Sequence, residues 1–306
     1  MPFINLGAVR LHYLQIQPET QPKDPVTDVV FIHGLGANLG FWYFNIAPAI
    51  ADIARVTLFD LRGHGRSSMP DSGYRLEDLA SDLLGLLEYL EIDSPHLVGH
   101  SLGGAVMGKF AAMHPVEAAS LMFVDTRLKL YQPTMTLADW PNWEAVGPLL
   151  NDLGIVLRPD QGEVSYQLLR EVARLKCEDT DHGRDLMIKL ADSILAGFAY
   201  TGPGGRRAAG QLLKLLETTS ALLDLSKDDD ITEAQLKKLK CPIGSVYGGA
   251  SQTLATQQAM TKLWPQLRSW IVPNAGHFFP INQPHALTQA LRYFLRCVTS
   301  EKETTM

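Results

Sequence analysis

The sequence predicts an α/β protein whose central sheet is mostly parallel and flanked by helices, with one helical insertion after the sixth strand. Three observations lead to this prediction. Compact apolar runs that stop at Gly or Asp recur along the chain, as buried strands do. Segments with helical spacing alternate with these runs, which is typical of βαβ units. One interval of more than 110 residues between two such runs is far longer than a simple crossover needs.

The elements follow in order from these patterns. At the N-terminus we expect Phe3–Leu6 and Val9–Ile16 to form a strand pair that turns at Gly7. The later strands are expected at Val29–His33, Arg55–Phe59, His96–Val98, Leu121–Val124, Ile243–Tyr247 and Ser269–Val272. Helices are expected at Leu76–Leu90, Leu102–Met113 and His285–Cys297.

The long interval between the sixth and seventh strands is rich in Leu and aromatic residues. Apolar side chains at helical spacing, among them Leu212 and Leu216, indicate helices rather than a linker. We therefore expect residues 1–126 and 241–306 to form the core. Residues 127–240 are expected to form a mainly helical lid that includes a crossover helix.

The composition excludes several classes of protein. With 46% hydrophobic and 20% charged residues, the chain of 306 residues is not disordered. A formal charge of −6 without a basic run gives no footprint for nucleic acid. The 3 cysteines lack CxxC spacing and indicate ordinary buried thiols in a reducing compartment, rather than a disulfide or zinc framework. No secretory signal is visible, and no apolar stretch reaches the roughly 18 residues of a membrane span. We expect a cytoplasmic protein without nucleic-acid partners, and its oligomeric state stays open.

A Gly-x-Ser-x-Gly pattern lies between an expected strand and an expected helix, with Ser101 between Gly99 and Gly103. This spacing suits a sharp turn that exposes the serine hydroxyl at a helix N-terminus, where developing negative charge is favoured. The same residues also fit a Gly-rich turn with an idle serine. The strand and helix on either side favour a nucleophile.

Acyl transfer by a serine also requires oxyanion donors and a base. The backbone N–H groups of Leu35 and Leu102 form the expected donor pair, although a plain turn would explain the glycines around Leu35 equally well. Among 9 histidines, His277 alone follows the last strand in a Gly-containing loop. We expect it to accept the proton of Ser101.

Together these motifs resemble those of the α/β-hydrolase superfamily, over nearly the whole chain. The residues that carry the resemblance are His33-Gly34-Leu35-Gly36, Asp60-Leu61-Arg62-Gly63-His64-Gly65-Arg66-Ser67, Gly99-His100-Ser101-Leu102-Gly103-Gly104 and Gly276-His277. The resemblance implies the α/β-hydrolase fold, a Ser–Asp/Glu–His triad, a lid over the site, and neither cofactor nor metal. It says little about the substrate.

The acid of the triad departs from the superfamily pattern. It usually follows the strand after the lid in a Gly-x-x-Asp pattern, and Ser251 stands in that place here. Between Cys241 and Ser300 there is no Asp or Glu, and a neutral residue cannot stabilise an imidazolium. Some members draw the acid from the strand after the nucleophile's helix, so we favour Asp125, although it could also be a plain turn residue. Asp224 and Asp228–Asp230 are weaker alternatives.

The substrate is expected to be a small molecule with an apolar acyl or alkyl group. The side chains expected to bind it are Tyr131, Trp140, Trp143 and Phe198, which could equally pack the lid's own core. The leading hypothesis is a carboxylic-ester hydrolase that forms an acyl-enzyme. A thioesterase or a carbon–carbon bond hydrolase would use the same residues. The rival class is a non-hydrolytic receptor or pseudoenzyme that kept Ser101 and His277 but lost the acid.

Overall fold

The fold is built on a single eight-stranded sheet with the order β1-β2-β4-β3-β5-β6-β7-β8. The computed structural model describes residues 2–18, 27–115, 117–140, 143–152, 154–158, 162–178 and 203–305. The strands are β1 (Phe3–Leu6), β2 (Val9–Ile16), β3 (Asp28–Ile32), β4 (Arg55–Phe59), β5 (His96–His100), β6 (Ser120–Val124), β7 (Ile243–Gly248) and β8 (Arg268–Val272). The β1–β2 and β2–β4 pairs are antiparallel, and all other pairs are parallel.

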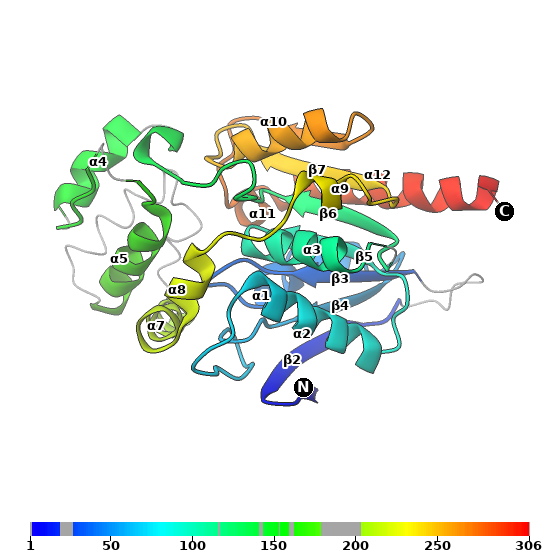
Figure 1. Cartoon of the computed structure of the whole chain (residues 1–306), viewed down its shortest axis with the longest axis horizontal. Coiled ribbons are helices and arrows are strands. Elements are labelled where there is room, and N and C mark those ends of the chain that lie inside the picture. Colours follow the sequence, from blue (N-terminus) through cyan, green and yellow to red (C-terminus); the bar gives the residue numbers. More distant parts are fainter. Residues whose placement is uncertain are drawn as a thin grey trace.

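Helices cover both faces of this sheet (Figure 1). The helices that flank the sheet are α1 (Gly40–Tyr43), α2 (Leu76–Tyr89), α3 (Leu102–Met113), α9 (Glu233–Leu236), α10 (Leu254–Leu263), α11 (Phe279–Asn282) and α12 (Pro284–Thr305). The remaining described helices are α4 (Trp143–Asp152), α5 (Ser165–Glu178), α7 (Pro203–Thr218) and α8 (Ala221–Ser226), which lie together beyond one end of the sheet.

Alternation along the strands divides the interior into two layers. Val30 and Ile32 of β3 face the layer of α2 and α3, whereas Val29 and Phe31 face the layer of α12. All four side chains are fully buried, as expected for a strand covered on both faces. The apolar runs of the sequence predict the strands for this reason, and the structure confirms the α/β-hydrolase fold.

The insertion leaves the sheet at the carboxyl end of β6 and returns at β7 (Figure 1). Within it α5 packs against α7. Helix α7 begins at Pro203, since proline is tolerated at the first position of a helix. Near the end of the insertion, Leu236 of α9 is buried against the core beside α3. Over the described ranges, no helix is both long and apolar enough to cross a membrane.

Candidate active site

Ser101 occupies the sharp turn between β5 and α3. Its backbone has φ 53° and ψ −121°, a conformation that a serine keeps only when its surroundings enforce it. A Cβ on Gly99 would lie 2.5 Å from the carbonyl oxygen of Gly103, and one on Gly103 would lie 2.2 Å from that of Ile32. The glycines therefore permit the tight packing that presents the Ser101 hydroxyl at the first turn of α3.

His277 lies in the loop after β8 and faces Ser101. Its Nε2 is 3.0 Å from the Ser101 Oγ, and the residue is 7% exposed. The backbone carbonyl of His277 accepts a hydrogen bond from His100 Nε2 at 3.0 Å. Because His100 directly precedes Ser101, this bond ties the histidine loop to the nucleophile turn.

Asp125 directly follows β6 and completes a chain of hydrogen bonds. Its amide donates to the Val246 carbonyl at 2.9 Å, which continues the β6–β7 ladder, while its φ of 44° turns the chain out of the strand. His277 Nδ1 donates to Asp125 Oδ1 at 2.7 Å. With Nδ1 protonated, Nε2 of the same ring is free to accept the Ser101 hydroxyl proton.

The Asp125 carboxylate is fully buried and heavily hydrogen-bonded. Its Oδ2 accepts from the Gly248 amide at 2.8 Å, and its Oδ1 also accepts from Ser251 Oγ at 2.5 Å and Thr253 Oγ1 at 2.6 Å. Burial alone would raise the pKa of Asp125. The hydrogen bond and charge of His277, then the Gly248 amide and the Ser251 hydroxyl, outweigh burial and lower the pKa below its ordinary value. The carboxylate is therefore charged at neutral pH.

The weaker acid candidates have other partners. Asp224 accepts a hydrogen bond from Ser220, and Asp229 accepts one from the Lys129 amide at 2.8 Å. Asp230 forms an ion pair with the arginine that caps α2. Ser251, at the usual place of the acid, donates to Asp125 instead. The structure thus brings Asp125, rather than these residues, to His277.

Leu35 and Leu102, whose amides are the expected oxyanion donors, line the same pocket as Ser101. In the described part of the chain neither amide donates to a protein acceptor. The turn that carries Leu35 is fixed by His33, whose Nδ1 donates to the Gly34 carbonyl at 2.8 Å and whose Nε2 accepts from the Leu61 amide at 3.1 Å. Two unengaged N–H groups beside a serine are what an oxyanion site requires.

A pocket opens over Ser101 and encloses about 1120 Å³ of space that is continuous with solvent. Its apolar wall includes Leu35, Phe41, Ala105, Met135, Trp140, Leu169 and Phe278. The cations Arg127 and Lys129 and the carboxylates Asp228 and Asp229 line another part of it. No group of three or more His, Cys, Asp or Glu side chains suited to a metal ion occurs in the ranges that the structure describes.

The aromatic side chains expected to bind substrate are divided by the structure. Trp140 lines the pocket. Tyr131 packs instead against the main core, and Trp143 packs against the apolar cluster of the insertion. Neither residue is among those that line the pocket over Ser101, which agrees with the alternative interpretation that their rings fill cores, and substrate binding by them stays a prediction. Phe198 lies outside the described residues.

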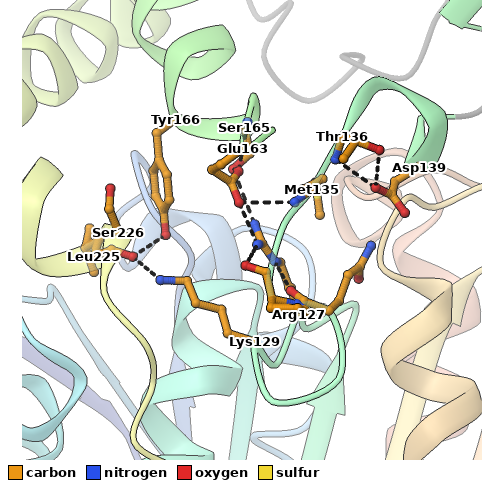
Figure 2. A network of polar contacts seen from close by, with 12 residues as sticks. Arg127, Lys129, Met135, Thr136, Asp139, Glu163, Ser165, Tyr166, Leu225 and Ser226 are labelled. Atoms are coloured by element: carbon orange, nitrogen blue, oxygen red, sulfur yellow. Dashed lines mark hydrogen bonds and ion pairs between the residues drawn. The ribbon is translucent and has the colours of Figure 1, made fainter. Parts of the chain in front are cut away.

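Polar contacts join the loop after β6 to the insertion (Figure 2). Glu163, just before α5, accepts from Arg127 Nη2 at 2.6 Å and from the Met135 amide at 3.1 Å. Lys129 Nζ donates to the Leu225 carbonyl of α8, which also accepts from Tyr166 OH at 2.7 Å. Because Met135 and Tyr166 line the pocket, this network fixes part of its roof. The sequence did not reveal this network, since its partners are up to 96 residues apart.

Three buried histidines around the site are held neutral. Burial lowers the pKa of His33. Burial, together with the proximity of His33, lowers the pKa of His64 to about 3. Burial, and then the neighbouring His277, lowers the pKa of His100 to about 3. The ring of His277, by contrast, lies 3.0 Å from Ser101 Oγ and is placed for proton exchange with it.

Comparison with known proteins agrees with this fold. A family model described as alpha/beta hydrolase fold matches residues 28–152. The carboxylesterase structure from Nitrososphaera gargenis has a TM-score of 0.67 at 21% identity and covers 98% of this chain and 100% of that one. The chain has the fold of the α/β-hydrolase superfamily.

Curated relatives carry several different activities. The chain is 26% identical over 272 residues to the pimeloyl-[acyl-carrier protein] methyl ester esterase of Aeromonas hydrophila subsp. hydrophila, covering 88% of this chain and 95% of that protein. It is 28% identical over 279 residues to the dihydrolipoyllysine-residue acetyltransferase component of the acetoin cleaving system of Pseudomonas putida. The match covers 88% of this chain, but the chain spans only 64% of the length of that second relative.

Proposed function

We propose that the protein hydrolyses carboxylic esters through an acyl-enzyme on Ser101. The observation that carries the proposal is the unbroken chain of hydrogen bonds from Ser101 through His277 to Asp125, with links of 3.0 and 2.7 Å. This chain of hydrogen bonds runs from Ser101, which lines an open pocket, to the buried carboxylate of Asp125. This arrangement activates a hydroxyl that is otherwise a weak nucleophile.

The reaction follows from the proton positions. Ser101 Oγ attacks the ester carbonyl while His277 Nε2 takes its proton, and the charge of Asp125 stabilises the imidazolium that forms. His277 then returns the proton to the departing alcohol, which leaves the acyl group on Ser101. Water, deprotonated by His277, attacks the acyl-enzyme and releases the acid. The amides of Leu35 and Leu102 would hold the oxyanion in both steps.

The pocket supports an ester with an apolar acyl or alkyl group. Met135, Trp140 and Leu169 form much of its apolar wall, and they come from the insertion rather than from the sheet core. The insertion is thus proposed as a lid that selects the substrate. The cysteines Cys241 and Cys297, which are half-buried, and Cys177, which is exposed rather than buried as expected, support the proposal of a cytoplasmic location.

The alternatives use the same groups. A thioester would be attacked at the same carbonyl position, and thioesterase activity is the second candidate reaction. The receptor hypothesis rested on Ser251 at the usual position of the acid. Asp125 Oδ1 lies 2.7 Å from His277 Nδ1, so a carboxylate is in contact with the histidine. The observation that motivated the receptor hypothesis, a missing acid, therefore no longer supports it.

Turnover of a short ester tests the proposal. The purified protein is expected to hydrolyse p-nitrophenyl butyrate, and Ser101→Ala is expected to lower kcat by at least about 1000-fold. A fluorophosphonate should label the unsubstituted protein and not the variant. Slow labelling without turnover would favour a receptor, and equal turnover by both proteins would refute a role for Ser101.

A further inference from the structure

Two hydroxyl groups converge on the buried oxygen of Asp125 that also binds His277. Ser251 Oγ lies 2.5 Å and Thr253 Oγ1 2.6 Å from Asp125 Oδ1. Both residues are almost completely buried, with exposed fractions of 5% and 1%. Asp125 Oδ1 thus accepts three hydrogen bonds, of which one leads to the imidazole.

The direction of the Ser251 hydrogen bond is fixed by the backbone. The Thr253 amide donates to Ser251 Oγ at 3.3 Å, so a lone pair of this oxygen is occupied. A carboxylate has no proton to give at neutral pH, and the Ser251 proton therefore lies toward Asp125. The same reasoning assigns the Thr253 hydroxyl as a donor to the carboxylate.

The loop that carries these hydroxyls is anchored to the segment that leads into His277. The Gly249 amide donates to the Val272 carbonyl at 2.8 Å, and the Ala250 amide donates to the Ala275 carbonyl at 2.9 Å. The approach is so close that a Cβ on Gly248 would lie 2.2 Å from the Ala275 oxygen.

A third attachment comes from the loop after β6, the strand that Asp125 directly follows. Gln132, which is buried, donates its amide to the Gln252 carbonyl at 2.9 Å, between Ser251 and Thr253. The loop after β7 is therefore hydrogen-bonded both to the segment that follows Asp125 and to the segment that leads into His277, and it fixes their relative positions.

We propose that Ser251 and Thr253 are positioning residues, whose hydroxyls hold the Asp125 carboxylate against His277. This inference rests on the proposed function. Because the acid follows β6 in this protein, the position after β7, where the superfamily usually has its acid, holds no carboxylate. The Ser251 hydroxyl in that place, with Thr253, compensates a charge that burial would otherwise disfavour, and it restricts rotation of the carboxylate.

Paired substitutions at both positions test the inference. Ser251→Ala and Thr253→Val remove one hydroxyl each, whereas Ser251→Thr and Thr253→Ser keep it. With p-nitrophenyl butyrate we expect about a 10-fold loss of kcat for each removal, about 100-fold for the double removal, and little change in KM. The two conservative variants should retain kcat within about threefold, and thermal unfolding should verify that every variant is folded.

A second readout does not depend on turnover. The proton on His277 Nδ1 should give a low-field NMR resonance, identified by its loss in His277→Asn. We expect the resonance to weaken or shift in the Ser251→Ala/Thr253→Val protein and to persist in the conservative variants. An unchanged resonance in the doubly substituted, folded protein would overturn the inference. If the unsubstituted protein fails to turn over esters, the proposed function fails, while the resonance still tests the positioning role.

Discussion

Replacing Asp125 by Asn removes one charge at the end of the hydrogen-bonded chain and leaves the shape of the side chain. Asn also tolerates the φ of 44° at this position. In the proposed reaction the carboxylate of the unsubstituted protein faces an imidazolium, and the two groups lie 2.7 Å apart in the structure. At an effective dielectric constant of about 20, that attraction is about 6 kcal/mol, or about 10⁴ in rate.

We therefore expect Asp125→Asn to lower kcat for p-nitrophenyl butyrate by about 10⁴-fold, with KM much less affected. The labelling rate of Ser101 by a fluorophosphonate should fall in parallel. Asp230→Asn is the matched control, because this alternative acid pairs with an arginine on the surface, and it should keep its turnover. If Asp125→Asn, folded by thermal unfolding, retained ester turnover, the assignment of the acid would be wrong.

Three further predictions concern the turn, the pH dependence and the roof of the pocket. Gly103→Ala should destabilise the protein by more than about 3 kcal/mol in thermal unfolding, because its Cβ would lie 2.2 Å from a backbone oxygen. Gly108→Ala, with ordinary contacts at 3.5 Å in the same helix, should be neutral or stabilising, and equal effects would contradict the turn geometry. His64 and His100 have a folded pKa of about 3, below the ordinary 6.5, so the unfolded chain binds more protons as the pH falls through 6.5. The free energy of unfolding in urea should therefore fall by about 2 kcal/mol per histidine from pH 7 to pH 5, and a flat profile would refute their neutrality. Glu163→Gln should raise KM for p-nitrophenyl butyrate about threefold by weakening its ion pair and leave kcat nearly unchanged, whereas a loss confined to kcat would contradict a role in the roof.

Much of the fold could be predicted because its central strands are buried on both faces. Runs such as Arg55–Phe59 are short and mostly apolar, and the structure has that strand with the same bounds. The ends of strands and helices were harder to predict where polar residues continue the strand or helix. The strand that begins at His96 extends to His100, two residues beyond its apolar part, and the last helix extends to Thr305.

Some residues of the site could be predicted directly from local sequence and others could not, for a physical reason. Ser101 and His277 lie in local turns whose glycines are visible in the sequence. Asp125 could be inferred only from the absence of later carboxylates, since its hydrogen bond spans 152 positions. The sequence could not separate pocket from core for Tyr131 and Trp143, because an aromatic ring suits both environments.

The central claim is that Ser101 becomes acylated during turnover. Mass spectrometry of the protein, quenched in acid within the first turnovers of p-nitrophenyl butyrate, tests this claim directly. We expect a mass increase that corresponds to one butyryl group on the peptide that contains Ser101, and none in Ser101→Ala. Full turnover with no such adduct, or with an adduct on another residue, would contradict the account.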